Sequence, residues 1–184
     1  MFPIINIKRS SKVLLIPRSI KYKSQEYIIT CISNGSFYNS CKIKSVQFSD
    51  DSELQIIEEG AFSYSSIENI SIPSSVVDFK PECFKKMREL KKIHIDAKNS
   101  QYKTYDDQLI LKKSSPEKED FDVLAFSVPN IVSIKIPDTI EIIESHVFEG
   151  CDQLKKIEIT RNSKLKIIEE DAFNGSSIES IYVP

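Results

Sequence analysis

A 21-residue segment of this 184-residue chain occurs twice, and this repetition constrains the fold more than any other feature. The first copy, ELQIIEEGAFSYSSIENISIP, spans residues 53–73, and the second, KLKIIEEDAFNGSSIESIYVP, spans residues 164–184. The copies lie 111 positions apart (164 − 53), and 13 of their 21 residues are identical. Self-similarity of this kind is typical of stacked supersecondary units that bury a shared core.

A shorter signal, an apolar triplet with offsets of 0, +3 and +5, recurs along the chain. The triplets start at positions 43, 67, 90, 131, 154 and 178, so the successive intervals are 24, 23, 41, 23 and 24 residues. Four intervals agree, and the third exceeds its neighbours by 18 residues (41 − 23). The pattern therefore predicts a regular array with one insertion. The triplets are Ile43/Val46/Phe48, Ile67/Ile70/Ile72, Leu90/Ile93/Ile95, Ile131/Ile134/Ile136, Leu154/Ile157/Ile159 and Ile178/Ile181/Val183.

A phenylalanine recurs with the same period as the triplets. Each one lies five residues after an apolar residue and five or six residues before the next triplet. All four glycines stand two residues before or two residues after such a phenylalanine. Because glycine permits tight turns at little steric cost, this phase of the repeat is expected to be a corner. The phenylalanines are Phe37, Phe62, Phe84, Phe148 and Phe173, and the glycines are Gly35, Gly60, Gly150 and Gly175.

These two markers predict a β-rich solenoid of the α/β leucine-rich-repeat type, with stacked 23–24-residue repeats, short parallel strands and one inserted hairpin near residues 101–128. The +3 and +5 residues share one face of a strand, because strand side chains alternate. Proline often follows and ends the strand ladder, as at Pro73 and Pro137. One repeat cannot bury its own apolar face, whereas stacked neighbours can. An ordinary α+β domain with chance similarity is the alternative, and propeller blades of about 40–45 residues are excluded by the period.

Residues 136–159, IPDTIEIIESHVFEGCDQLKKIEI, resemble the repeats of the BspA-like leucine-rich-repeat proteins, surface antigens of parasitic protists and some bacteria. Those repeats read roughly sv.sIg..AF.gc.sL.sI.IP, and residues 54–73 and 165–184 are similar to them. The segment NSQYKTYDDQLILKKSSPEKEDFDVLAFSVP is similar to the hairpin-like insertion in which such proteins write F.s.DGvLy. The resemblance implies a cell-surface module for adhesion or recognition.

We expect one leucine-rich-repeat domain over residues 1–184. Residues 1–32 are irregular and are interpreted as an N-terminal cap, residues 33–96 and 131–184 as repeats, and residues 97–130 as the hairpin-like insertion. The sequence stops where a strand would just have ended. The last repeats are therefore expected to be truncated, with an open last coil as the alternative.

Charge and hydropathy bear on the partners and the location. The chain has 25 basic and 27 acidic residues, a net charge of −2, so no global field attracts nucleic acid or anionic lipid. No stretch approaches the roughly 20 apolar residues of a membrane span, and the start, MFPIINIKRSSK, has a shorter apolar run than a signal peptide. The resemblance implies the cell surface, whereas the sequence as written would leave the protein in the cytoplasm, and no membrane insertion is expected.

Residue types that carry catalysis or bind metals are few and isolated. The two histidines, His94 and His146, have no repeated partner; His146 is expected to fill a corner and His94 to face solvent. The cysteines show no CxxC pair and no ligand-like spacing, and are expected to be small buried hydrophobes rather than disulfide partners or metal ligands. We therefore expect no enzymatic activity, no cofactor and no metal. The cysteines are Cys31, Cys41, Cys83 and Cys151.

Two charge patterns have structural explanations. The pairs Glu58/Glu59 and Glu169/Glu170 recur at the same repeat position, which favours a shared structural task in a solvated turn over acid–base chemistry or a cation site. The basic run KKMRELKK, residues 85–92, has no aromatic interleaving and acidic neighbours. Binding to nucleic acid is therefore not expected.

A partner is predicted to bind the strands through the residues between the buried triplet positions. If positions 0, +3 and +5 point inward, the +1, +2 and +4 side chains face solvent and form columns in a stacked array. Lysine is concentrated there, so an acidic protein or a glycan is the expected partner; the alternative is that the lysines only maintain solubility and prevent edge pairing. An intracellular interaction scaffold is the alternative to a surface module. The predicted contact residues are Lys91, Lys92, His94, Lys135, Lys155, Lys156, Glu158 and Tyr182.

Overall fold

The computed structural model describes residues 12–182, and the chain folds into two compact units. The first unit comprises the residues up to Glu89 together with His94–Ser100, and the second comprises Leu90–Ile93 and the residues from Gln101 onward. Residues 1–11 of the expected N-terminal cap and Val183 of the last triplet lie outside the described residues.

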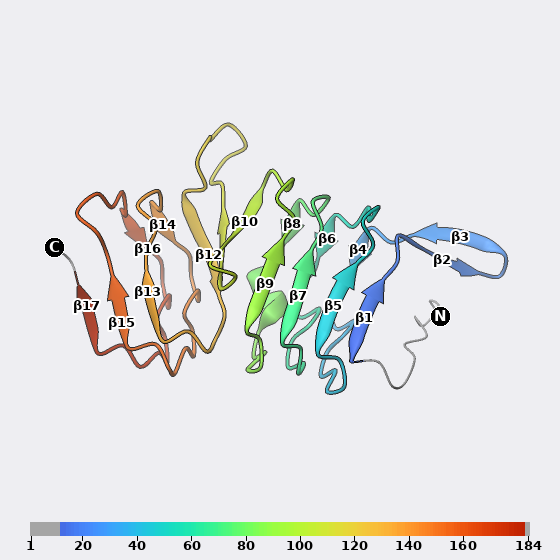
Figure 1. Cartoon of the computed structure of the whole chain (residues 1–184), viewed down its shortest axis with the longest axis horizontal. Coiled ribbons are helices and arrows are strands. Elements are labelled where there is room, and N and C mark those ends of the chain that lie inside the picture. Colours follow the sequence, from blue (N-terminus) through green and yellow to red (C-terminus); the bar gives the residue numbers. More distant parts are fainter. Residues whose placement is uncertain (1–11, 183–184) are drawn as a thin grey trace. The chain divides into compact units, whose positions relative to one another are not determined.

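Two stacks of short parallel strands build the first unit (Figure 1). In one stack Val13 pairs with Ser45, and Ser45 pairs with Asn69, so that equivalent residues of successive repeats lie side by side. The second stack has the same parallel pairing one repeat apart. The first stack contains β1 (Val13–Ile16), β5 (Ser45–Phe48), β7 (Asn69–Ile72) and β9 (Lys92–Ile95), of which only His94 and Ile95 belong to this unit. The second stack contains β4 (Cys31–Ile32), β6 (Ile56–Ile57) and β8 (Asp78–Phe79).

Two further elements belong to the first unit. An antiparallel hairpin of β2 (Ser19–Tyr22) and β3 (Gln25–Ile28) projects from it (Figure 1). The hairpin turns through Lys23 and Ser24, whose φ angles of 48° and 65° are those of a two-residue turn that matches strand twist. The 3₁₀-helix η1 (Pro81–Phe84) is the only helix within residues 12–182, and proline at its first position costs no hydrogen bond.

The second unit contains a parallel stack and the inserted strands. The parallel strands β13 (Ser133–Lys135), β15 (Lys156–Glu158) and β17 (Ser180–Tyr182) form one sheet. The inserted strands β10 (Tyr102–Tyr105), β11 (Leu109–Lys112) and β12 (Val123–Ser127) pair in antiparallel fashion. β12 also pairs in parallel with β14 (Ile142–Ile143), which pairs in turn with β16 (Ile167–Ile168). The insertion thus supplies the first strand of the second parallel stack.

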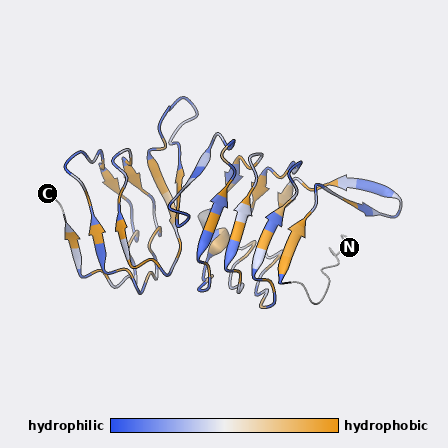
Figure 2. Cartoon of the chain, viewed as in Figure 1, coloured by the Kyte–Doolittle hydropathy of each residue, from blue (hydrophilic) through white to orange (hydrophobic). Residues whose placement is uncertain are grey.

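This arrangement confirms the predicted β-rich solenoid of stacked leucine-rich repeats with short parallel strands and one inserted hairpin. Most members of the apolar triplets line the core as the period predicts: Val46, Ile67 and Ile93, for example, are completely buried. The prediction fails in part at Phe48, Ile159 and Ile178, which are half-buried. Figure 2 shows hydrophobic and hydrophilic residues alternating along the strands of the parallel sheets. Successive side chains of a strand point to opposite faces, so each strand of a stacked coil buries one face in the core and exposes the other to solvent.

The repeated phenylalanines stack on one another inside each unit. In the first unit the Phe62 ring lies between those of Phe37 and Phe84, with centroid separations of 5.3 and 6.2 Å and interplanar angles of 7° and 20°. In the second unit the Phe148 and Phe173 rings lie 5.1 Å apart at 3°. These distances fall within the roughly 4.5–7 Å range of favourable ring stacking. A continuous aromatic ladder therefore joins successive corners within each unit.

Each corner turns through residues in the left-handed region of φ, placed two before and two after the phenylalanine. Four of the five corners have both, whereas at Phe84 the helix η1 replaces the first. Glycine takes the earlier position in the first unit and the later position in the second, so the other position always carries a side chain. A side chain there costs roughly 1–2 kcal/mol. His146 (φ 62°) is such a residue, which confirms it as a corner filler; the others are Asn39, Tyr64, Lys86 and Asp171.

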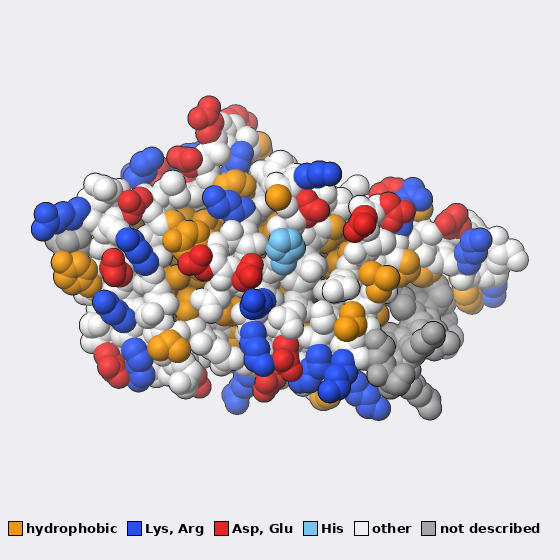
Figure 3. All heavy atoms as spheres, in the orientation of Figure 1, with side chains coloured by type: hydrophobic (Ala, Val, Ile, Leu, Met, Phe, Trp, Pro, Cys, Tyr) orange, Lys and Arg blue, Asp and Glu red, His pale blue; other side chains and the backbone are white. Residues whose placement is uncertain are grey.

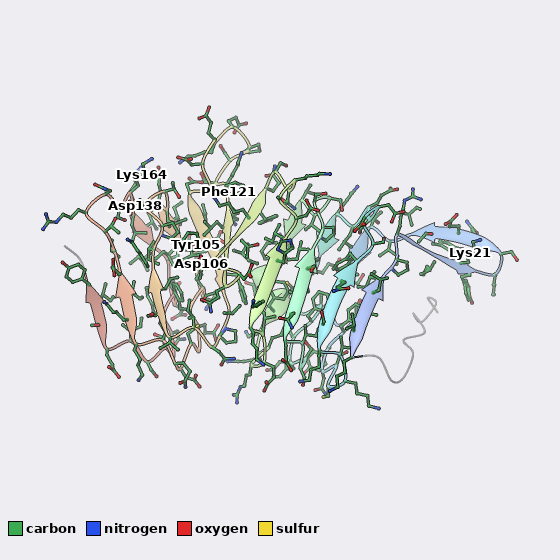
Figure 4. The ribbon with its side chains drawn as sticks, in the orientation of Figure 1. Lys21, Tyr105, Asp106, Phe121, Asp138 and Lys164 are labelled. Atoms are coloured by element: carbon green, nitrogen blue, oxygen red, sulfur yellow. The ribbon has the colours of Figure 1, made fainter. Side chains whose placement is uncertain are left out.

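Buried polar contacts anchor the loop between β11 and β12. The Asp122 side chain is 3% exposed, and its carboxylate accepts hydrogen bonds from the N–H (2.8 Å) and hydroxyl (2.7 Å) of Ser114. It also forms a 2.6 Å ion pair with the Lys118 ammonium. Phe121 lies at the base of the same loop (Figure 4), with the ammonium groups of Lys103 and Lys113 5.4 and 5.5 Å from its ring centroid. These contacts fix both ends of the inserted loop on the second unit.

The cysteine prediction is correct for two of the four residues. Cys83 and Cys151 are buried in the core, as expected of small hydrophobic side chains. Cys41 is exposed and Cys31 only half-buried, so for these two the prediction is wrong. None of the four cysteines belongs to a triplet, so the repeat pattern does not fix whether each one is buried.

The outermost coil of the second unit is less buried than its predecessors. Ile181 and Ile168 are 50% and 48% exposed, whereas their equivalents Ile157 and Ile143 are each 1% exposed. The expectation that every +3 position is buried therefore fails at Ile181. The reason is that β16 and β17 are edge strands within the described residues, so no further coil covers their outer faces.

Candidate interaction surface

The side chains at the +1, +2 and +4 positions of the triplets form a solvent-facing surface in each unit, which we call the strand face. Seven of the eight predicted contact residues are exposed, and Glu158 is half-buried. His94 faces solvent on β9 between the buried Ile93 and Ile95, as its position in the repeat requires. A role of these residues in binding stays a prediction.

Strand pairing aligns the predicted residues of the second unit into columns. Lys135, Glu158 and Tyr182 are register partners on β13, β15 and β17. Lys156 lies in the neighbouring column, between Ser133 and Ser180. Because paired strands lie roughly 4.8 Å apart, side chains in one column are close enough to contact a single partner together.

Ion pairs interrupt the lysine columns. The Lys155 ammonium lies 2.9 Å from the Glu179 carboxylate, and that of Lys135 lies 3.8 Å from Glu158. Figure 3 shows lysine and arginine side chains interspersed with acidic ones over this face. The strand face is thus a mixed-charge surface rather than a uniformly basic one. Exposed pairs of this kind contribute only about 0–1 kcal/mol each, so a partner could replace them at little cost.

The turn between β10 and β11 adds carboxylates to the strand face that the sequence did not predict. The Asp107 carboxylate lies 3.8 Å from the Lys92 ammonium, and the Asp107 carbonyl accepts a 2.9 Å hydrogen bond from the Ile93 N–H. Figure 4 shows the neighbouring Tyr105 and Asp106 on the same turn. Sequence reasoning assigned this segment to the insertion, outside the triplet columns. The predicted hairpin was correct, but nothing in the sequence indicates that its turn lies beside Lys92.

Exposed apolar side chains also lie on the strand face. Val132 and Tyr182 are 59% and 56% exposed in the second unit, and Leu15 is 58% exposed on β1 of the first. Binding energy at protein interfaces is concentrated in apolar and aromatic side chains surrounded by polar ones. Val132 and Tyr182 therefore give the second unit the more favourable combination of apolar contacts and neighbouring charges.

Groups that could support covalent or metal chemistry lie apart from one another. Within residues 12–182, no three His, Cys, Asp or Glu side chains come together as a metal site would require. Burial raises the pKa of Cys151 to about 12 and that of Cys83 well above its ordinary value. Both thiols therefore stay protonated at neutral pH and are poor nucleophiles. His146 Nδ1 lies 3.3 Å from the Glu149 carboxylate, three residues away on the same corner.

The recurring carboxylates connect successive coils. Glu58 Oε2 accepts a 2.9 Å hydrogen bond from the Asn34 N–H, and Glu169 Oε2 accepts a 3.0 Å hydrogen bond from the Ser145 N–H. Each pair is separated by 24 residues, and the two bonds occupy equivalent positions of the repeat. The first glutamate of each pair thus satisfies a backbone donor in the preceding corner, which is the shared structural task that the repetition indicated.

Among residues 12–182 no helix combines the length and the apolar character that crossing a bilayer demands.

The chain matches the family described as "BspA type Leucine rich repeat region". The match covers residues 18–107 and 120–184 and comprises six copies of the repeat. No curated protein matches the chain.

Several solved structures share the fold. The pneumococcal vaccine antigen PcpA is similar with a TM-score of 0.68 and 24% identity, over 92% of this chain and 39% of that one. A leucine rich cell surface protein from Faecalibacterium prausnitzii A2-165 has a TM-score of 0.59 and 20% identity, over 85% and 41% of the two chains. A leucine-rich repeat protein from Bacteroides ovatus ATCC 8483 has a TM-score of 0.52 and 17% identity, over 90% and 50%. The chain spans at most half the length of these structures, and at these identities the likeness concerns the fold.

Proposed function

Because the chain belongs to the BspA-type leucine-rich-repeat family, we propose that it is a non-catalytic interaction module that acts in adhesion or recognition at the cell surface. The partner is a protein or a glycan, and the strand face is where it binds. The observation that carries this proposal is the alignment of exposed charged, apolar and aromatic side chains into columns on β13, β15 and β17. Extended surfaces of stacked repeats are those that repeat proteins commonly use for binding.

The composition of the strand face supports binding to a polar or acidic partner. Val132 and Tyr182 supply exposed apolar area, and the surrounding lysines supply hydrogen-bond donors. The pairing of Lys155 with Glu179 limits nonspecific attraction of anions, so recognition depends on a partner that matches both charges. Binding is expected to weaken with salt, since exposed charges are screened over about 8 Å at physiological ionic strength.

Location at the cell surface is proposed from the family and from the descriptions of similar structures. The Faecalibacterium relative is described as a cell surface protein, and the pneumococcal one as a vaccine antigen. Labelling of intact cells with a membrane-impermeant reagent is expected to modify this protein. Labelling only after lysis would instead favour an intracellular interaction scaffold.

Capture of partners from host or own-cell lysate tests the strand face. A variant with Lys91, Lys92, Lys155 and Lys156 changed to Glu is expected to lose the partners that the unaltered protein captures. The same partners, captured with the same salt sensitivity, would refute the strand-face site, and catalytic turnover by a clean preparation would refute the non-catalytic assignment. The matched control changes four exposed cations outside the strand face to Glu and is expected to capture normally: Lys21, Lys42, Lys98 and Arg161.

A further inference from the structure

Two adjacent corners of the first unit enclose a shallow hollow of about 420 Å³, outside the strand face. One wall is the corner that follows Phe62, and the other is the turn that follows η1. The volume lies within the roughly 300–1,000 Å³ of sites for small ligands. The lining residues are Tyr64, Ser65, Ser66, Lys86, Arg88 and Glu89.

The hollow combines one exposed aromatic ring, that of Tyr64, with cations. The Tyr64 ring is 51% exposed and lies 5.4 Å, at an interplanar angle of 52°, from the Tyr38 ring, which is 56% exposed. Lys86 and Arg88 supply an ammonium and a guanidinium on the opposite wall. The guanidinium suits planar, bidentate recognition of carboxylate or sulfate oxygens, while the ammonium acts as a mobile point charge.

Polar side chains complete the lining. Ser65 is 3% exposed, and its Oγ has no hydrogen-bond partner within the described part of the chain. Ser66 adds a hydroxyl, which both donates and accepts hydrogen bonds, and Glu89 adds a carboxylate, which accepts them. Apart from the Tyr64 ring, the lining offers no apolar side chain that would anchor a peptide.

The backbone places two of these side chains in the hollow at a cost. Tyr64 and Lys86 both have φ of 59°, in the left-handed region that disfavours side chains. The equivalent positions of the second unit are Gly150 and Gly175, with φ of 68° and 67°. Glycine therefore fits this position of the corner, and the first unit instead carries a tyrosine and a lysine there. Strained positions that keep a functional side chain are typical of binding sites.

We propose that this hollow binds an acidic glycan, a sugar that bears a carboxylate or a sulfate. The Tyr64 ring offers a flat face for a sugar ring, and Lys86 and Arg88 neutralise the acidic group. The serine hydroxyls and Glu89 bind sugar hydroxyls, which both donate and accept hydrogen bonds. The site lies entirely within the first unit and does not rest on partner binding by the strand face.

The position of Tyr64 and Lys86 allows a clean test. Tyr64→Gly and Lys86→Gly each remove a side chain from the hollow while keeping a residue that accepts the corner's backbone conformation. His146→Gly makes the same kind of change at a left-handed position of the second unit and serves as the matched control. All three variants are therefore expected to fold, which melting temperature and circular dichroism check.

Calorimetric titration of the full chain with a heparin-derived hexasaccharide, a hyaluronan hexasaccharide and maltohexaose measures binding and identifies the anion. We expect at least one acidic sugar to bind, the neutral sugar not to bind, and each hollow variant to weaken binding at least tenfold while His146→Gly binds normally. Preference for heparin indicates sulfate recognition, and preference for hyaluronan indicates carboxylate recognition.

Three results would overturn the proposal. One is that neither acidic sugar binds at millimolar concentration, and another is that the hollow variants bind them as the unaltered chain does. The third is that a poly-glutamate peptide binds equally well and is lost in the same variants, because the hollow would then recognise charge alone. A variant with Lys155 and Lys156 changed to Glu must bind the acidic sugar normally, since these residues lie on the strand face.

Discussion

Replacing Phe62 by Ala removes the central ring of the first unit's aromatic ladder. Phe62 is completely buried, and its ring stacks on Phe37 at 5.3 Å and on Phe84 at 6.2 Å. Truncation of a buried phenylalanine costs about 3–5 kcal/mol, and each stacked pair adds about 0.5–1.5 kcal/mol beyond the buried area. We therefore expect a loss near 5 kcal/mol, on the order of the lower bound of a typical domain's stability.

Urea unfolding followed by circular dichroism and tyrosine fluorescence measures this loss, since the chain contains no tryptophan. With a denaturant slope of about 2 kcal/mol/M, the midpoint of the first unit should fall by about 2.5 M. Phe173→Ala is the comparison, because Phe173 is half-buried and, within residues 12–182, stacks on Phe148 alone. Its effect should be clearly smaller. A midpoint unchanged by Phe62→Ala, or equal losses at the two positions, would refute the ladder as a source of stability.

Two further predictions concern the acidic residues. Glu58→Gln and Glu169→Gln should each lower stability by less than about 1 kcal/mol, because a charged acceptor of a backbone N–H becomes uncharged. Glu59→Gln is the control and should leave the melting temperature unchanged. Equal effects of the three substitutions would contradict the structural role of Glu58 and Glu169. Burial alone would raise the pKa of Asp122, but the Lys118 ammonium and the Ser114 donors outweigh it and lower this pKa to about 2. Since the unfolded pKa is about 3.9, the ionised carboxylate stabilises the fold above about pH 4, and this contribution is lost as the pH falls through 2. Asp122→Asn should therefore destabilise the protein at pH 7 by about 2 kcal/mol, and its stability should fall less steeply between pH 4 and pH 2 than that of the unaltered chain. If the two proteins lose stability equally over this pH range, Asp122 is not the source of the loss.

Much of the fold was predictable because period and alternation act on the backbone of every repeat in the same way. Burial at Ile67 and Ile93 follows from their triplet positions. Contacts that no repeat shares were not predictable. The pairing of Val123 with Ile142, through which β12 joins β14 and β16 of the second unit, depends on how the insertion packs rather than on the period.

The candidate sites were predictable to different extents for the same reason. Outward columns of the strand face follow from alternation alone, so the exposure of residues such as Lys156 was foreseeable. The pairing of Lys92 with Asp107 was not, since it joins a triplet to the insertion. The hollow was also missed: the run of residues 85–92 has no aromatic residue in sequence, and its aromatic neighbour, Tyr64, comes from the preceding coil.

The corners explain why an acidic-sugar site belongs to only one of the two units. Every corner places backbone in the left-handed region near its phenylalanine, and in the four corners that contain a glycine it relieves only one of the two positions. In the first unit glycine precedes Phe37 and Phe62, and η1 takes that place before Phe84, so the column after the phenylalanine carries Asn39, Tyr64 and Lys86 in successive coils. In the second unit that column consists of Gly150 and Gly175, which present no side chain to a ligand. The position of the glycine therefore determines which unit has side chains after the phenylalanine that can contact a ligand: the first unit has them and the second does not.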